Sequence, residues 1–342
     1  MKMKFFQFAQ ALTATSLLCI TGMNAQNVAP GYEVAQWHQF KNAAISYTFD
    51  DNTPKQLTVA MPLFDKVGFN ATLFPVINWD LNWPGYRDAV ANGHEIGSHT
   101  VTHMNLGDAT ISDETKEAEM SRSKSVIDAE ITAAKCVTIA YPFCNIGVEQ
   151  VLPKYYIAGR VCSGVVENST PSDFYRISSI CCGTQGLNSV SELNEKVASA
   201  LKNEGWCVLM FHAIDDDNGY SPISSVVLGD HLGFVKSHDK EYWVETFANV
   251  VKYIKERNAT TVSEKFINKK KMQVNVTDGL DNNVYDRAIT IRRELPKGWI
   301  NAKVMLAGVE IASTRSIVDH QRFVTFDVIP DRGDVVISKV RE

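Results

Sequence analysis

Two histidines spaced four residues apart are the first side chains in this sequence whose types and spacing suggest chemistry. His99 and His103 open and close a short polar stretch. On a helical turn, residues four apart lie on one face, so both imidazoles can reach one ion. Imidazole is a common ligand of Zn²⁺ and its first-row neighbours. The pair is therefore a candidate metal site, although the same spacing also occurs by chance on soluble helices.

Two adjacent carboxylates would complete such a site. Asp50 and Asp51 end the apolar run Ile45–Phe49, whose alternation predicts a strand. In α/β barrels, the C-terminal ends of the strands carry the chemistry. Two imidazoles and one carboxylate make a three-ligand site that keeps a position for water, and the second acid is then free to act as a base. A solvated pair of acids in a turn is the alternative interpretation.

Alternating strands and helices are expected to position these groups. Because βα units cross over with a right hand, the alternation predicts a distorted (β/α)7-type barrel of the α/β class. The expected strands cover 44–49, 71–76, 94–98, 136–143, 157–162, 176–180 and 206–211, with 260–262 closing the barrel. The expected helices cover 53–67, 84–92, 112–134, 190–204 and 243–257.

Three segments with different patterns divide the chain. Residues 1–25 read as a secretory signal peptide, since Lys2 and Lys4 precede an apolar run and small residues lead to Ala25. Residues 26–265 hold the barrel. Residues 266–342 hold short alternating strands and are expected to form a small antiparallel β-sandwich. We therefore expect export to the periplasm or the outside of the cell.

The amino-acid composition limits the kinds of binding partner that we expect. The 342 residues include 34 basic and 39 acidic side chains, a net charge of −5, without a long basic run. This balance argues against nucleic acid, and no later run is apolar enough to span a membrane. Six cysteines remain once Cys19 leaves with the signal peptide, and their pairing cannot be read from the sequence. The oligomeric state is also left open.

Four predicted strand ends carry polar groups in chain order, and their motifs resemble a known family. The groups are Asp50-Asp51, His99 with His103, Tyr141-Pro142-Phe143, and His212. Thr48-Phe49-Asp50-Asp51, the stretch from His99 to His103, and Leu209-Met210-Phe211-His212 resemble three motifs of the polysaccharide deacetylases, carbohydrate esterase family 4 or the NodB homology domain. The resemblance covers about residues 43–261.

The resemblance implies a role for each matching residue. Asp51, His99 and His103 correspond to the metal ligands, Asp50 to the base that deprotonates the attacking water, and His212 to the acid that protonates the leaving group. One divalent ion is implied; Zn²⁺ is the default on ligand type, with Co²⁺ or Ni²⁺ as alternatives. The oxyanion and substrate are expected to meet the turn that holds Tyr141 and the backbone N–H of Phe143.

Two departures from the family pattern concern the accessory groups. Where the family places an arginine beside the base, this sequence has Ala140. Arg160, on an apolar predicted strand, is the candidate replacement, and because an unpaired buried charge is costly we expect it to pair with Asp50. An Arg160 that points into solvent is the alternative. The family's second acidic motif has only a weak counterpart at Asp173.

Three further residues are candidates for contact with a glycan. Asp215, in an acidic loop after His212, can bond sugar hydroxyls, or it is simply solvated. Trp83, on the loop after the second strand, can stack on a sugar ring or pack in the core. Trp299 suggests carbohydrate binding by the C-terminal segment, but a core position is the preferred interpretation.

These expectations describe a secreted, metal-dependent hydrolase that removes acetyl groups from an acetylated polysaccharide or oligosaccharide. The motifs do not separate an O-acetyl ester from an N-acetyl amide, because both pass through the same oxyanion; the weakened accessory motifs favour the ester, whose leaving group needs less help. A carbohydrate-binding pseudoenzyme that keeps the metal site is the main alternative. A hydrolase of small amides is a third, which fits the predicted export less well.

Overall fold

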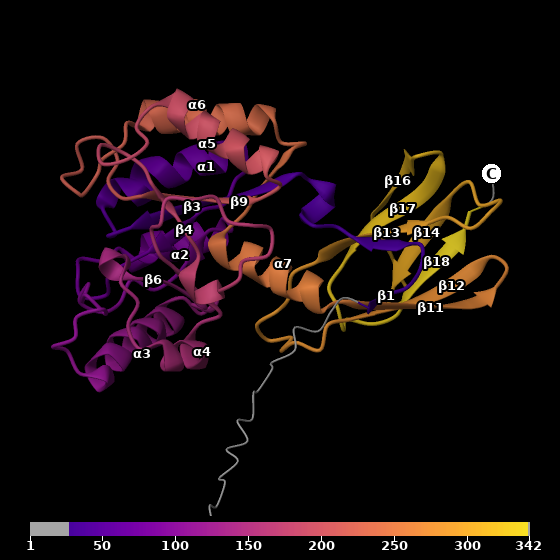
Figure 1. The fold of residues 1–342 in the computed structure, drawn as a ribbon, viewed down its shortest axis with the longest axis horizontal. Coiled ribbons are helices and arrows are strands. Elements are labelled where there is room, and N and C mark those ends of the chain that lie inside the picture. Colours follow the sequence, from indigo (N-terminus) through magenta and orange to yellow (C-terminus); the bar gives the residue numbers. More distant parts are fainter. Residues whose placement is uncertain (1–26, 341–342) are drawn as a thin grey trace, which may run out of the picture.

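The computed structural model describes residues 27–340, in which an α/β part is followed by a part made of strands (Figure 1). The predicted signal peptide, with Cys19, lies outside the described residues. Within 27–340, none of the helices combines the length and the apolar character needed to cross a membrane.

The α/β part is built on a parallel sheet with the order β5-β4-β3-β9-β8. Its central strands, β3 (Ala43–Asp50) and β9 (Trp206–Phe211), are buried along their whole length, as expected for strands covered on both faces. The neighbours are short: β4 (Thr72–Phe74), β5 (Glu95–Ile96) and β8 (Ile180–Cys181). β10 (Tyr242–Val244) pairs with the start of β3.

A separate parallel pair, β6 (Thr138–Ala140) and β7 (Ala158–Arg160), stands beside this sheet. Single bridges link it to the sheet on either side, Ser98 to Ile139 and Arg160 to Ile177. The α/β class is therefore confirmed, but the ladders do not form the closed sheet that the predicted barrel requires. The reason is local: several strands hold only two or three residues, too few to continue a ladder.

Helices cover the sheet (Figure 1). They are α1 (Met61–Val67), α2 (Trp83–Ala91), α3 (Asp113–Glu130), α4 (Leu152–Tyr155), α5 (Val190–Lys202), α6 (Ser225–Ser237) and α7 (Phe247–Ala259). A π-helical turn, Gln56–Ala60, precedes α1.

Three helices differ from the prediction: the short α4 and the longer α6 were not predicted, and α7 begins later than expected. Sequence analysis missed α6, whose two internal glycines lower helix propensity and whose buried Leu228, Leu232 and Val235 stabilise it through packing. The helix expected at 243–257 begins later, because residues 242–244 form β10 and the Thr246 side chain caps α7 by accepting a hydrogen bond from the Asn249 N–H.

The second part, which we call the β part, contains two sheets. One has the order β1-β11-β12-β18-β14-β15 and the other β16-β17-β13-β2. Their bounds are β1 (Asn27–Val28), β2 (Tyr32–Val34), β11 (Thr261–Asn268), β12 (Lys271–Thr277), β13 (Ile289–Glu294), β14 (Ala302–Leu306), β15 (Val309–Ile311), β16 (Ser313–Val318), β17 (Gln321–Val328) and β18 (Val335–Lys339).

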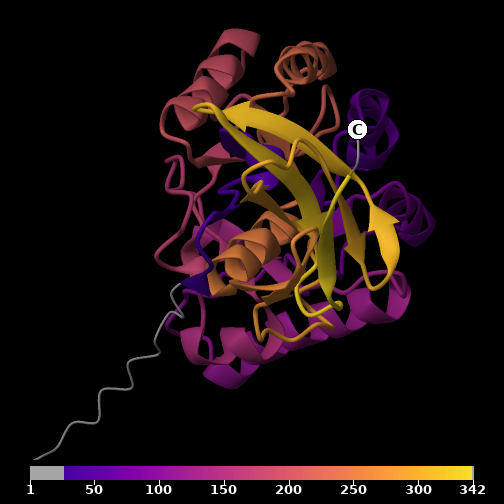
Figure 2. The same cartoon turned by 90° about the vertical axis from the view of Figure 1, so that its right-hand side faces the viewer.

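Apart from the parallel β1–β11 pair, all pairings in the β part are antiparallel, and Figure 2 looks onto these strands. Apolar residues of both sheets pack in one cluster, as in Val274, Val304 and Val324. Trp299 is buried in this cluster, which agrees with a core position. Residues 260–262 were expected to close the barrel; that expectation is wrong, because Thr261 begins β11. The predicted boundary at residue 266 also falls inside β11.

α7 joins the two parts. Its Val250 and Ile254 belong to the same apolar cluster as Trp206 of β9 and Ile289 of β13. The Tyr253 hydroxyl donates a hydrogen bond of 2.9 Å to the Ala35 carbonyl. The two parts therefore share one continuous core rather than meeting across a polar surface.

Candidate active site

The candidate site is built from chain segments at the C-terminal ends of the parallel strands, where the backbone is unusually strained. Asp50 ends β3, and Asp51 then adopts a left-handed conformation with φ +72°. Thr100, His103 and Phe143 also have positive φ values, of 68°, 60° and 55°. Such conformations are uncommon for residues other than glycine and tend to cluster at functional sites.

This geometry corrects one expectation. His99 and His103 were expected to share one face of a helical turn, but residues 99–103 form an irregular bend rather than a helix. The left-handed conformation of Thr100 folds the segment back, so that the centroids of the two imidazole rings lie 4.9 Å apart. The spacing predicted the right pair of residues, although the backbone brings them together by a different path.

Asp51, His99 and His103 converge on one point. The Asp51 Oδ1 atom lies 3.5 Å from the Nε2 atom of each histidine, and the three possible ligand atoms lie within 4.8 Å of one another. His99 Nδ1 bonds to the Ala140 carbonyl at 2.8 Å. Since a carbonyl can only accept, Nδ1 carries the proton and Nε2 presents its lone pair to this point, as a metal ligand must.

Burial also favours the ligand forms of the imidazoles. Removal from water lowers the pKa of His99 to about 4 and lowers the pKa of His103, so both rings are neutral near pH 7. Burial, with the neighbouring Asp50 charge, raises the pKa of Asp51 to about 7. A bound cation would favour the charged carboxylate of Asp51. This set of donors fits a first-row divalent ion.

α3 supports the histidine segment through a single carboxylate. Glu119 accepts hydrogen bonds from the backbone N–H groups of Val101 (2.9 Å) and Thr102 (2.8 Å), and from the Thr102 hydroxyl (3.0 Å). The Asn78 N–H donates to the Val101 carbonyl from the other side. These bonds hold the bend that places His99 and His103.

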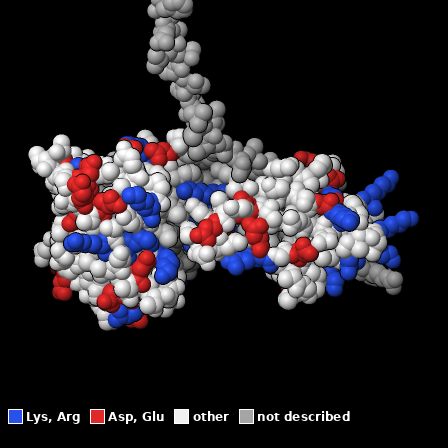
Figure 3. Space-filling view, turned by 90° about the horizontal axis from the view of Figure 1, so that it is seen from below, with Lys and Arg blue, Asp and Glu red and all other residues white. Residues whose placement is uncertain are grey.

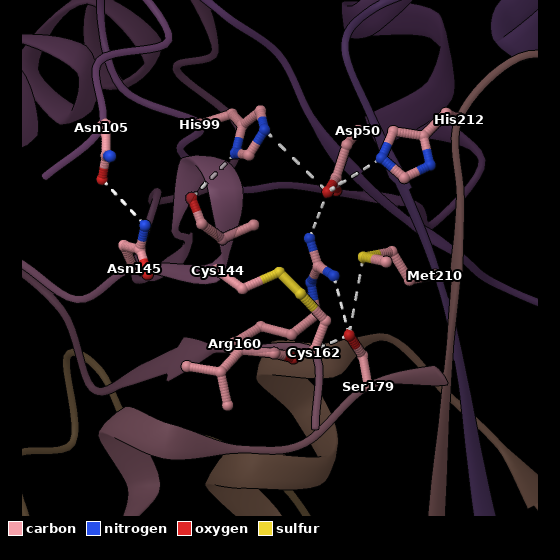
Figure 4. Close-up of a disulfide and its surroundings, with 12 residues drawn as sticks. Asp50, His99, Asn105, Cys144, Asn145, Arg160, Cys162, Ser179, Met210 and His212 are labelled. Carbon is pink, nitrogen blue, oxygen red and sulfur yellow. Dashed lines mark hydrogen bonds and ion pairs between the residues drawn. A yellow bond between two sulfur atoms is a disulfide. The ribbon is translucent and has the colours of Figure 1, made fainter. Parts of the chain in front are cut away.

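Asp50 lies at the centre of a second group of charges (Figure 4). Its Oδ2 atom forms an ion pair with Arg160 and lies 3.9 Å from Nε2 of both His99 and His212. The expected pairing of Arg160 with Asp50 is confirmed, and both side chains are buried. Arg160 is held in turn by the Ser179 hydroxyl, to which its Nη1 donates at 2.9 Å.

The electrostatic balance keeps Asp50 charged. Burial alone would raise its pKa, but Arg160, with His99 and His212, outweighs burial and lowers the pKa below the usual value. The other carboxylate oxygen, Oδ1, is buried without a hydrogen-bond partner among the described residues. Asp50 lines the pocket described below, so this free oxygen is the acceptor that a base requires.

His212 follows β9 directly and lacks the second partner that often orients a catalytic imidazole. Its Nδ1 atom is buried and has no hydrogen-bond partner within residues 27–340, and burial lowers its pKa. Asp173, the weak sequence counterpart of the family's acid, lies elsewhere: it caps a turn at Tyr175 and pairs with Arg176 at 3.4 Å. The ring of Tyr220 contacts His212 edge-on at 4.8 Å.

These groups line a pocket of about 560 Å³. Of the predicted site residues, it is lined by Asp50, Asp51, His99, His103, Tyr141, Phe143, Arg160 and His212. Tyr141 is itself buried, and its hydroxyl donates to the Tyr175 carbonyl at 3.0 Å. Phe143 is 63% exposed at the rim.

Two predicted substrate contacts do not line this pocket. Asp215 accepts a hydrogen bond of 2.8 Å from the Ser225 N–H, which ties its loop to the start of α6. Trp83 is the first residue of α2, where it packs on the core and against Tyr86.

Several residues of the site were missed by sequence reasoning. Trp79 is not among the residues that line the pocket, but its ring lies over that of His103 with centroids 5.4 Å apart; Tyr220, which does line the pocket, contributes a second aromatic edge. A disulfide between Cys144 and Cys162 also lines the pocket (Figure 4). The sequence carried one usable signal: Trp79 follows the strand β4 more closely than Trp83 does.

Comparison with known proteins shows what the α/β part is similar to. Residues 38–151 match the family described as polysaccharide deacetylase. We call the α/β part, which contains this match, the deacetylase part. Members of this family are hydrolases that act on acetylated polysaccharides. The match includes Asp50, Asp51, His99 and His103, and it ends before Arg160 and His212.

Solved structures share the fold of the deacetylase part. A putative polysaccharide deacetylase from Mycobacterium smegmatis is 16% identical, with a TM-score of 0.50 over 65% of this chain and 93% of the other. A family 4 carbohydrate esterase from Streptomyces lividans in complex with acetate is 15% identical, with a TM-score of 0.44 over 59% of this chain and 91% of the other.

The match to one curated relative covers both parts of this chain. A gellan lyase from a Bacillus species is 27% identical over 327 residues. The match covers 89% of this chain but only 13% of that protein.

Proposed function

We propose that this protein removes O-acetyl groups from a polysaccharide, with Asp50 as the base and His212 as the acid at a metal site formed by Asp51, His99 and His103. The observation that carries this proposal is the position of Asp50. Its carboxylate lies between the three candidate metal ligands and His212, and one of its oxygens has no hydrogen-bond partner among the described residues.

The candidate ligands would hold one divalent ion, with Zn²⁺ the default for this donor set and Co²⁺ or Ni²⁺ as alternatives. When bound, the ion supplies a Lewis acid that makes water a better nucleophile and polarises the acetyl carbonyl. The protein orients the ligands through Ala140, which fixes the His99 tautomer, and through Glu119, which fixes the bend.

The chain's own residues move the protons. Asp50 accepts a proton from the attacking water through its free oxygen, and Arg160 holds the carboxylate in place. The water oxygen forms a bond to the acetyl carbon, and the bond from that carbon to the sugar oxygen breaks. His212 delivers a proton to the departing oxygen, so the products are acetate and a sugar hydroxyl. The backbone N–H of Phe143 at the rim is the proposed oxyanion donor.

The environment of His212 favours an ester over an amide. Burial lowers the pKa of this imidazole, and among the described residues no second partner holds a proton on its Nδ1 atom. Its supply of protons to a leaving group is therefore weak. An alkoxide departs with less help from an acid than an amine does. We therefore place O-acetyl esters ahead of N-acetyl amides.

Three exposed aromatic rings around the pocket favour a sugar chain as the substrate. Trp79, Phe143 and Tyr220 are 42%, 63% and 55% exposed, and each contacts a site histidine. Exposed aromatic faces are costly to leave in water, and they suit the C–H faces of pyranose rings. Each ring lies against a histidine of the site, so a sugar stacked on one of them would lie close to the candidate catalytic groups.

A carbohydrate-binding pseudoenzyme is the second candidate, and His212 is the observation that favours it. An acid that lacks its orienting partner and an arginine supplied from a different strand could leave binding intact while slowing turnover. The intact set of Asp50, Asp51, His99, His103 and His212 argues against this alternative.

Acetate release from a panel of glycans tests the proposal. The panel contains acetylated xylan, chitin oligomers, peptidoglycan and acetylated gellan, the last because of the name of the curated relative. We expect release from ester-bearing substrates, abolished by a chelator and by Asp50→Ala. The control, Asp216→Ala, removes an exposed acid and should keep full activity.

Each other outcome has a clear meaning. Release from amides alone would remove the preference for esters. No release by the metal-loaded protein, together with retained glycan binding, would favour the pseudoenzyme. Secretion of the full-length chain with cleavage after Ala25 would test the proposed export.

A further inference from the structure

A groove of about 550 Å³ lies in the β part, and none of its lining residues belongs to the deacetylase pocket. Arg315 and Ile317 of β16 form one wall, and Arg322 and Phe323 of β17 form another, with Ile300 beside them. Ile317 is 71% exposed and Ile300 is 46% exposed. The groove thus combines exposed apolar side chains with two guanidinium groups.

Strand register explains this combination. β16 is the edge strand of its sheet, and it pairs with β17 so that Arg315 lies opposite Val324 and Ile317 opposite Arg322. Directly opposite residues share one face of the sheet, and residues two apart in a strand share it as well. Val324 is fully buried, so this is the face that packs on the core. At the end of the hairpin the same face continues without a covering layer.

Among the residues that the structure describes, neither arginine has an acidic partner. No ion pair involves Arg315 or Arg322 within residues 27–340. The β part as a whole also carries more basic than acidic side chains: residues 27–34 and 261–340 hold 13 basic and 11 acidic side chains, whereas residues 35–260 hold 18 and 27. Figure 3 shows Lys and Arg side chains projecting from the end of the molecule formed by the β part.

We propose that this groove binds a polysaccharide chain that bears carboxylates. A guanidinium fork matches a carboxylate with two parallel hydrogen bonds, which is a better fit than a lysine offers. Ile300 and Ile317 suit the C–H faces of sugar rings.

Charge favours this occupant over a nucleic acid. The full chain has a net charge of −5, and the deacetylase part would repel a phosphate backbone that extended past the groove. A carboxylated polysaccharide has a lower charge density, and its uncharged sugars can lie beside the acidic part. The proposal goes beyond the proposed function, because binding in the groove needs neither a metal ion nor Asp50.

Affinity measurements with the full chain test the proposal, with polygalacturonate as the probe and its fully methyl-esterified form as the neutral match. We expect polygalacturonate to bind and the ester to bind at least about tenfold more weakly, as loss of two charge-assisted contacts predicts. The variant Arg315→Ser with Arg322→Ser should weaken polygalacturonate binding about tenfold or more. The matched control, Lys269→Ser with Lys270→Ser, removes two charges from an exposed turn of the same part and should bind as the wild type does.

Several outcomes would overturn the proposal. The wild type could fail to bind polygalacturonate, or it could bind the methyl ester equally well. An equal loss of affinity in the lysine control would show that charge in general, rather than the groove, attracts the polymer. Tighter binding of single-stranded DNA or of anionic phospholipid vesicles would assign the groove to another partner. Acetate release by the arginine variant from a short soluble substrate should be unchanged, which separates this test from that of the proposed function.

Discussion

The two parts of the molecule present their charged side chains in opposite ways. In the deacetylase part, Asp50 and Arg160 are buried against each other and their positions are set by strained backbone. In the β part, Arg315 and Arg322 project from regular strands, and neither has an acidic partner within the described residues. Chemistry on a bond requires fixed, desolvated groups, whereas adhesion to a polymer requires accessible charge. The difference therefore separates a site for reaction from a site for attachment.

The two parts differ in their charged groups but share one apolar core. A substitution that removes a large buried side chain tests whether they also unfold together. Phe326→Ala in β17 removes a buried ring and should lower the free energy of unfolding by about 3–5 kcal/mol. Because α7 packs both parts into one cluster, we expect one unfolding transition that moves as a whole. Denaturant unfolding followed by far-UV circular dichroism and by tryptophan fluorescence measures it.

The control for this variant is Phe266→Ala, at a half-exposed ring of β11, which should change stability little. If the two probes instead separated, so that the deacetylase part kept the wild-type transition, the two parts would be independent units.

A titratable group confined to the deacetylase core gives the second test. His231 is buried, its Nδ1 donates to Asn194 and its Nε2 accepts from the Tyr47 hydroxyl. Burial lowers its pKa to about 4, below the 6.5 of an unfolded chain. Its contribution to stability is thus complete above about pH 6.5 and is lost as the pH falls toward 4. The full effect is about 3 kcal/mol.

The measurement compares the pH dependence of unfolding free energy for the wild type and His231→Gln. The variant should show a flatter profile between pH 4 and 6.5, while His320→Gln, at an exposed position of the β part, should keep the wild-type slope. Parallel profiles for all three proteins would contradict the assignment of the slope to His231.

The third test concerns how the deacetylase part holds its ligand segment. Glu119→Gln leaves the size of the side chain intact but weakens its hydrogen bonds to the bend of Val101 and Thr102. Loss of such support typically costs 10- to 100-fold in metal affinity. Equilibrium dialysis with Zn²⁺ measures the change. Glu114→Gln, an exposed acid of the same helix, should bind Zn²⁺ as the wild type does.

The smallest expected effect concerns the aromatic rim. Trp79→Ala should raise KM for an acetylated polysaccharide several-fold, about 1 kcal/mol, with little change in kcat. Trp83→Ala is the matched comparison, because Trp83 packs in α2 against Tyr86, whereas Trp79 lies over His103. An equal rise in KM for both variants would show that the rim does not contact the substrate.

The sequence predicted the residues of the site better than the shape around them. Asp50, Asp51, His99, His103 and His212 were identifiable because each lies within a short local motif at a strand end. The pairing of Arg160 with Asp50 was also predictable, since a buried guanidinium needs a carboxylate.

The remaining features depend on contacts between distant segments. The position of Trp79 over His103 follows from left-handed residues such as Thr100, for which no local pattern exists. The pairing of Cys144 with Cys162 depends on the path of two loops. α6 depends on tertiary packing that overrides the low helix propensity of its glycines. Strands of two or three residues give too little alternation to predict how a sheet closes.

The pairing of β1 and β2 has a topological consequence. Both strands precede the deacetylase part in the chain, yet β1 pairs with β11 and β2 pairs with β13, on the far side of it. Among the described residues, the deacetylase part is therefore an insertion within the β part rather than its predecessor. Both ends of the deacetylase part continue into strands of the β part. Removing the strands after residue 260 would therefore leave β1 and β2 without partners and would expose the apolar face of α7 to water. Transfer of the α/β part into another protein would thus require the segments on both sides of it to be transferred as well.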